Sequence, residues 1–293
     1  MKISLAAVPY FWSKDTYQDF YQQIAHSNID LVYLGETVCS KRRSMNLGDW
    51  IEIGHYLTKQ GKQVVLSSMT LIEAESELKY LTKVLQQDQF LVEANDMAAI
   101  QIASQKNRNF VAGNSINIYN RQSFALFQRL GMKRWNIPVE LGENDIKPII
   151  PLAQQLDVEL EYQIYGRMPL AYSARCFTAR HHRLAKDNCQ FKCKDDIEGI
   201  PVKTREGDSF AQINGIQTQS GKISNLLNHW QKLQAANIDY ARIVPVTPAM
   251  TLKVIDALSH AIHHQLANVE LADDNREYCN GYWFKLAGLE MIA

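Results

Sequence analysis

Short runs of strand-forming residues alternate with longer amphipathic segments along most of the chain. Eight runs are expected to be strands, at residues 3–8, 30–35, 63–68, 90–94, 109–113, 134–140, 158–166 and 240–246. Most of them are separated by stretches with apolar residues at helical spacing. Eight strands alternating with helices predict an α/β fold, an incomplete or modified (β/α)8 TIM-like barrel. A doubly wound open sheet is the alternative, but no G-x-G-x-x-G motif follows the first strand.

The regular alternation breaks after the seventh predicted strand. More than seventy residues separate Gly166 from the next strong strand, and they include a polar tract and a short strand-like run at 210–221. We predict one barrel-like domain over residues 1–293, with residues 167–222 as an insertion. An insertion at this point lies at the carboxyl ends of the barrel strands, where active sites of this fold are found.

Four of the five cysteines are expected at this end of the barrel. Cys176, Cys189 and Cys193 lie in the insertion, and Cys39 follows the second predicted strand. Four thiolates in a tetrahedral array can hold zinc or a [4Fe-4S] cluster. Only Cys189 and Cys193 are as close as ligand pairs usually are, so the spacing leaves zinc, a cluster and free thiols open. Disulfides are least favoured, because we expect a reducing compartment.

Charge and hydropathy indicate in which compartment the chain works and which partners it does not bind. Lys plus Arg and Asp plus Glu each number 31, so no overall positive field favours nucleic acid. The N-terminal apolar run is interrupted at Pro9 and does not resemble a secretion signal. No apolar stretch approaches the roughly 20 residues that cross a bilayer. The sequence therefore predicts a cytoplasmic protein without a transmembrane segment and without stable nucleic acid.

Four segments of the sequence carry a family resemblance. They are DLVYLGETVCSKRR (30–43), MPLAYSARCFTAR (168–180), NGIQTQSG (214–221) and CNGYWFKLAGLE (279–290). Together they resemble the collagenase-like U-type peptidase family over essentially the whole chain. One departure is Pro169, which stands where related members carry a ligand cysteine; in the branch that this chain resembles, Cys39 supplies the replacement.

The resemblance implies a cofactor and a function. It implies a [4Fe-4S] cluster bound by Cys39, Cys176, Cys189 and Cys193, which makes residues 167–222 an iron-sulfur-binding insertion. It implies the iron-sulfur subunit of an oxygen-independent hydroxylase in anaerobic ubiquinone biosynthesis. This subunit would act as a heterodimer with a UbiU-like protein, assisted by a UbiT-like lipid carrier. The quinone precursor is the expected substrate.

Prephenate is the oxygen source in related pathways, so a dicarboxylate is an expected ligand. The cations near the cysteines are the candidate substrate contacts: Arg42, Arg43, Arg175 and Arg180. No catalytic residue is assigned, and the role of Cys279 is taken as structural.

Other readings of the sequence remain open. An enzyme of the same family that hydroxylates RNA and a zinc-stapled binding module are the alternatives. Proteolysis is not favoured, because neither H-E-x-x-H nor G-x-S-x-G occurs. Three carboxylates lie near the ends of predicted strands: Glu36, Glu93 and Glu140. They are either acid-base groups or carboxylates paired with arginines, and the second interpretation is slightly favoured.

Overall fold

The computed structural model of the protein describes residues 1–271 and 276–292, so residues 272–275 and 293 of the predicted domain lie outside the described residues. Eight parallel strands form a closed barrel. They are β1 (Lys2–Leu5), β2 (Leu31–Leu34), β3 (Gln63–Ser67), β4 (Leu91–Ala94), β5 (Phe110–Ala112), β6 (Met132–Asn136), β7 (Glu159–Tyr172) and β11 (Tyr240–Ile243). β11 pairs in parallel with both β1 and β7, which closes the ring. The predicted TIM-like barrel is confirmed in its modified form, with a complete ring and four further strands outside it.

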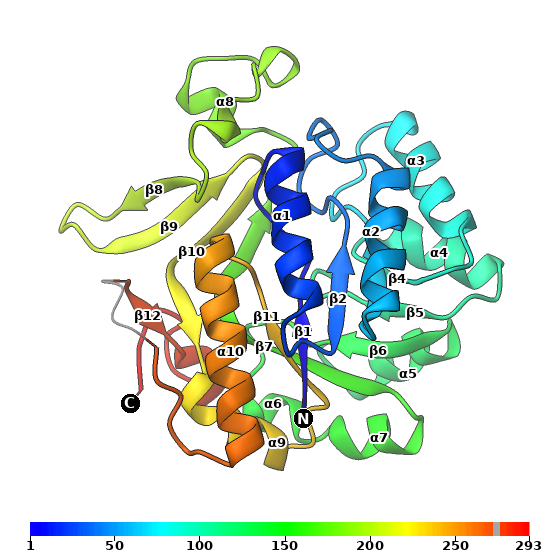
Figure 1. The fold of residues 1–293 in the computed structure, drawn as a ribbon, viewed down its shortest axis with the longest axis vertical. Coiled ribbons are helices and arrows are strands. Elements are labelled where there is room, and N and C mark those ends of the chain that lie inside the picture. The colour runs from blue at the N-terminus through cyan, green and yellow to red at the C-terminus, as the bar shows by residue number, and fades with distance from the viewer. Residues whose placement is uncertain (272–275, 293) are drawn as a thin grey trace.

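Helices alternate with the strands and cover the outside of the barrel (Figure 1). They are α1 (Lys14–Ala25), α2 (Leu47–Lys59), α3 (Glu75–Gln86), α4 (Met97–Gln105), α5 (Arg121–Arg129), α6 (Glu143–Ile146), α7 (Ile150–Gln155), α9 (Trp230–Ala235) and α10 (Pro248–His264). Several begin at side-chain caps: Ser13 caps α1, and Asn46 forms a capping box with Asp49 at α2. Between helices and strands lies one continuous apolar core that includes the fully buried Trp135 and Trp230.

The remaining elements extend the sheet beyond the ring. β7 continues past the barrel and pairs in antiparallel fashion with β10 (Gln217–Asn225), which pairs with β9 (Ser209–Asn214), which in turn pairs with β8 (Ile200–Lys203). β12 (Tyr278–Cys279) adds to β10 in parallel. α8 (Phe177–His181) and 3-10 turns at Lys186–Asn188 and Lys192–Lys194 precede β8, and further 3-10 turns lie at Leu227–His229 and Gly281–Phe284. The strand-like run at 210–221 is thus a hairpin.

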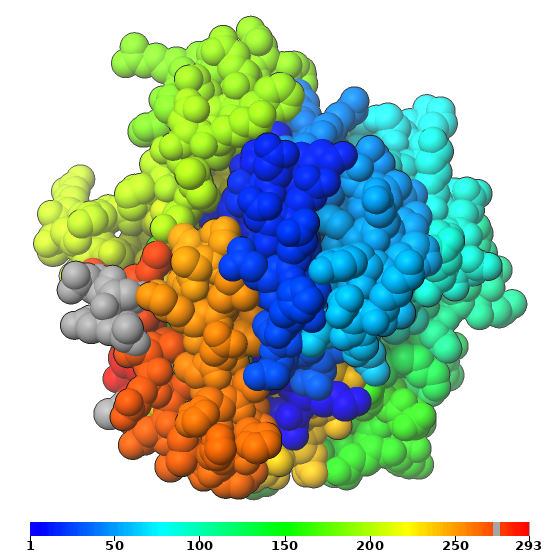
Figure 2. All heavy atoms as spheres, viewed as in Figure 1, coloured from blue at the N-terminus to red at the C-terminus, as the bar shows by residue number. Residues whose placement is uncertain are grey.

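This extension projects from one end of the barrel. Figure 1 shows α8 and its neighbouring turns beyond the carboxyl ends of the barrel strands, and Figure 2 shows the same segment as a knob above the N-terminal residues. Gly166 lies where β7 leaves the ring, with φ at +118°, and a Cβ there would approach the Val244 carbonyl oxygen to 2.5 Å. Only glycine tolerates both conditions. Among the described residues, no helix combines the length and apolar character that crossing a bilayer requires.

Candidate functional site

The four predicted ligand cysteines lie in three loops at the carboxyl end of the barrel. Cys39 follows β2, and Cys176 is the N-cap of α8. Cys189 is the C-cap of the first 3-10 turn of the insertion, and Cys193 lies within the second. All four are free thiols and partly buried. Burial raises the pKa of Cys39 and of Cys193; Cys176 adds to both shifts and Cys189 to that of Cys193, so these groups are within electrostatic reach of one another. The fold therefore brings Cys39 into the neighbourhood of Cys176, and Cys193 into the neighbourhood of Cys176 and Cys189.

The donor set suits a soft metal centre. It consists of four sulfur atoms, as in Zn(Cys)4 sites and [4Fe-4S] clusters. Within residues 1–271 and 276–292, no three cysteine, histidine or carboxylate side chains already surround one common metal position.

Burial and one arginine act in opposite directions on the thiols. Burial raises the pKa of Cys39 and of Cys193, whereas the positive charge of Arg42 lowers both. Cys279 lies apart in β12, fully buried against Val139 and Met168, and burial raises its pKa to about 11. This thiol is a core side chain.

Arg42 differs from the other candidate arginines because only 4% of it is exposed. Its Nη1 donates to the Pro9 carbonyl at 2.6 Å and its Nη2 donates to Asn214 Oδ1 at 2.7 Å. Glu36 Oε1 lies 3.8 Å from Nη1, which makes Glu36 a rim carboxylate paired with an arginine. Arg42 is therefore bound by protein groups and does not present its guanidinium to a substrate from solvent.

The other three candidate arginines face solvent. Arg43, Arg175 and Arg180 are exposed, the first in the loop after β2 and the others on either side of Cys176. The arginines predicted as one group therefore have two different environments, one buried and three exposed.

A small polar pocket lies between the barrel mouth and the sheet extension. Its volume is about 50 Å³, and its lining includes Arg167, Arg242, Glu93, Tyr172 and Gln217. One water requires roughly 10–15 Å³ of such space, so the pocket accepts a group of about the size of a carboxylate. The sequence interpretation missed it. The available signal was Arg242 within the apolar run YARIVPV, because a cation in a barrel strand must find a partner.

A charged network forms the floor of this pocket. Arg242 lies 2.8 Å from Glu93 and 3.3 Å from Glu161, and Ser67 donates to Glu93 at 2.6 Å. The expectation that Glu93 is a core carboxylate paired with an arginine is confirmed. Glu140, by contrast, is exposed and accepts a hydrogen bond from Tyr119.

A second cavity adjoins the small pocket. Its volume is about 590 Å³, and the two share Asn114, Pro169 and Tyr172 in their linings. Leu170 and Tyr282 add apolar and aromatic surface to it. A deep polar pocket thus adjoins a wider site that can accept an aromatic group.

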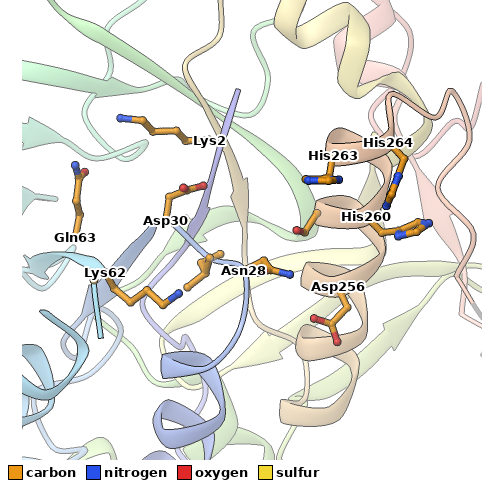
Figure 3. A pocket seen from close by; sticks show the side chains of 12 residues that line it. Lys2, Asn28, Asp30, Lys62, Gln63, Asp256, His260, His263 and His264 are labelled. Carbon is orange, nitrogen blue, oxygen red and sulfur yellow. The ribbon is translucent and has the colours of Figure 1, made fainter. Parts of the chain in front are cut away.

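A larger cavity lies at the opposite end of the barrel. Its volume is about 950 Å³, and Figure 3 shows Lys2, Asp30 and Lys62, at the amino ends of strands, across from histidines of α10. None of the eight predicted site residues lines it. Active sites of this fold lie at the carboxyl end, so we assign the candidate site there and not to this larger cavity.

Comparison with known proteins identifies the family. Residues 17–281 match the model of peptidase family U32. Solved structures with a similar chain path include wild-type HPPK-DHPS of Plasmodium falciparum, at 10% identity and a TM-score of 0.43 over 94% of this chain and 48% of that chain. Dihydropteroate synthase from Anaplasma phagocytophilum has 7% identity and a TM-score of 0.37, over 88% of this chain and all of that chain.

An enolase from Agrobacterium radiobacter has 12% identity and a TM-score of 0.37, over 55% of this chain and 45% of that chain. This chain thus spans less than half the length of the Plasmodium and Agrobacterium chains. These similarities are too low to carry an argument about function. The family match, in contrast, extends over most of the sequence, and the chain therefore belongs to peptidase family U32.

Proposed function

We propose that this chain is a UbiV-like protein, the iron-sulfur subunit of an oxygen-independent hydroxylase in cytoplasmic, anaerobic ubiquinone biosynthesis. A [4Fe-4S] cluster would be held by Cys39, Cys176, Cys189 and Cys193. The observation that carries the proposal is the placement of these four thiols, which come from two distant chain segments, in the loops at the carboxyl end of a barrel.

The surroundings of the thiols fit a cluster ligated by four thiolates. Such a centre is an anion, and the buried guanidinium of Arg42 lies close enough to lower the pKa of Cys39 and Cys193 against the effect of burial. The Nε atom of Arg42 is buried and has no hydrogen-bond partner among the described residues, so a donor is available beside the sulfurs. When bound, the cluster supplies one-electron chemistry.

The barrel mouth supports the binding of an oxygen donor that carries carboxylates, such as prephenate. Arg242 is already paired with two glutamates, whereas Arg167 lines the small pocket with a buried Nε that has no partner in the described part of the chain. Arg167 is thus the better candidate for a carboxylate in the deep pocket. The adjoining cavity, with Tyr282 and Leu170, offers room for a ring. The exposed Arg175 and Arg180 stay candidates for contacts at the outer rim.

The proposed reaction hydroxylates the aromatic ring of the quinone precursor, with a UbiU-like protein as the second subunit and a UbiT-like lipid carrier delivering the precursor. The test is anaerobic co-purification with a UbiU-like protein, followed by an assay of ring hydroxylation with oxygen excluded. We expect the two proteins to form a stable complex that hydroxylates the ring without oxygen. The hydroxylated product should contain ¹⁸O when the oxygen donor is labelled with ¹⁸O. If the complex forms and the hydroxylated ring appears only when air is admitted, the proposed function is wrong.

A further inference from the structure

We propose that Arg42 is a positioning residue for the iron-sulfur centre. It fastens the loop of Cys39 to the insertion that carries the other three thiols, and it places a fixed positive charge beside them. The inference rests on the proposed function, because it concerns the same cluster.

The first step is the organisation of the Cys39 loop. Glu36 Oε1 accepts hydrogen bonds from the backbone N–H groups of Val38 and Cys39, at 2.8 and 3.0 Å. The backbone N–H of Arg42 donates to the Cys39 carbonyl at 3.0 Å. The Arg42 guanidinium lies 3.8 Å from the same Glu36 carboxylate. Arg42 therefore holds the turn that carries Cys39 through two of its own groups, its backbone N–H and its guanidinium.

The second step links this loop to the insertion. Arg42 Nη2 donates to Asn214 Oδ1 at 2.7 Å, and Asn214 Nδ2 donates to the Pro9 carbonyl, which also accepts from Arg42 Nη1. One guanidinium and one amide thus join the segment after β1, the loop after β2 and the end of β9. This contact spans 172 residues of sequence.

The third step connects that junction to Cys176. Gly215, the residue after Asn214, accepts a hydrogen bond from Phe177 N at 3.0 Å and donates to Thr178 Oγ1 at 3.0 Å. Phe177 and Thr178 form the first turn of α8, whose N-cap is Cys176. Arg42 is thereby connected, through Asn214 and the adjoining Gly215, to the turn of α8 that begins at Cys176.

The fourth step is electrostatic. A guanidinium stays protonated in proteins, and here only 4% of the residue is exposed, so solvent screens its charge weakly. Reduction adds an electron to a cluster that is already an anion, and a nearby cation favours the reduced form. Removing the cation should therefore lower the midpoint potential, whereas loosening the loops alone should change cluster retention and leave the potential unchanged.

The experiment compares three variants purified anaerobically in the full chain. Arg42→Met removes the charge and the hydrogen bonds, Arg42→Lys keeps the charge without the planar fork, and Arg43→Gln is the control at the exposed neighbouring position. Iron and sulfide content, the rate of cluster loss to an iron chelator and the midpoint potential from an EPR redox titration are measured. Circular dichroism checks that each variant is folded.

We expect Arg42→Met to lose its cluster roughly tenfold faster or more, as removal of groups around metal ligands commonly does, and to have a more negative midpoint potential. Arg42→Lys should lose the cluster faster than wild type but keep a midpoint close to it, and Arg43→Gln should match wild type in both. If Arg42→Met loads no cluster, Arg42→Lys decides: faster cluster loss than in wild type supports the role of Arg42, and a wild-type loss rate contradicts it.

Two outcomes overturn the inference, and they are distinguishable. A wild-type protein that binds iron and sulfide while Arg42→Met keeps the same midpoint and loss rate contradicts the role of Arg42 alone. A wild-type protein without any cluster contradicts the proposed function, and the role of Arg42 falls with it.

Discussion

Arg242 and Glu93 form an ion pair inside the barrel, with Nη2 of the arginine 2.8 Å from Oε1 of the glutamate. Glu93 is 1% exposed and Arg242 7%, and Glu161, fully buried, lies 3.3 Å from the other Nη atom. Many barrels of this kind fill the same space with branched aliphatic side chains. Here paired charges stabilise the lumen and form the floor of the pocket at its mouth.

The first prediction concerns this network. Arg242→Met should lower the free energy of unfolding by about 3–5 kcal/mol, because it leaves two buried carboxylates without their cation. Urea unfolding monitored by circular dichroism measures the loss. Lys79→Met is the control, since it removes only an exposed ion pair with Glu75 and should cost about 0.5 kcal/mol or less. A loss below about 1 kcal/mol for Arg242→Met would mean that the network does not stabilise the barrel in this way.

The second prediction concerns the exit of β7 from the ring. Gly166→Ala should destabilise the protein clearly more than Gly61→Ala, although both glycines have positive φ. A Cβ added at Gly61 would have no atom within 4 Å, so alanine there costs only the backbone strain of about 1–2 kcal/mol. At Gly166 the contact with the Val244 carbonyl adds to that strain. Equal losses for the two variants in urea unfolding would contradict the close approach of these strands.

The third prediction concerns pH and His229. Burial, and secondarily Lys232, lowers the pKa of His229 below its usual 6.5. The folded state therefore favours the neutral imidazole, and the unfolded state binds more protons as the pH falls below about 6.5, so stability falls with it. His229→Gln should flatten the pH dependence of the unfolding free energy between about pH 7 and 5. His26→Gln, at an exposed position, serves as the control. A wild-type slope retained in His229→Gln would assign the effect to other groups.

The fourth prediction separates the ligand cysteines from the core cysteine. Cys193→Ala should abolish or strongly reduce bound iron, because it removes one of the four proposed ligands. Cys279→Ala should keep the iron and lose about 1 kcal/mol of stability, since it only opens a small space beside Val139 and Met168. Iron content per folded chain, measured after anaerobic purification, distinguishes the two. Equal iron in both variants would exclude Cys193 from the ligand set.

The barrel strands could be predicted because their signals are local. The run predicted at 158–166 contains the barrel part of β7, and that predicted at 240–246 contains β11. In each case a short apolar run between turn-forming residues is sufficient to indicate a buried strand. The alternation with helices then predicts a TIM-like barrel, whereas closure of the ring is seen only in the pairing of β11 with β1 and β7.

The environments of the arginines could not be predicted because they depend on distant contacts. In SKRR, Arg42 and Arg43 look alike, and only the approach of Asn214 and Pro9 buries the first and leaves the second in solvent. Arg242 likewise finds Glu93 across the barrel, 149 residues away in sequence. The sequence did not reveal the polar pocket for the same reason, because residues from distant segments line it.

The most direct test of the account is the iron and acid-labile sulfide content of the wild-type chain purified without oxygen. We expect a brown protein with about four irons and four sulfides per chain, as a [4Fe-4S] cluster requires. A colourless protein with about one zinc and no sulfide would show that the four thiols form a structural zinc site instead, and it would contradict the central claim.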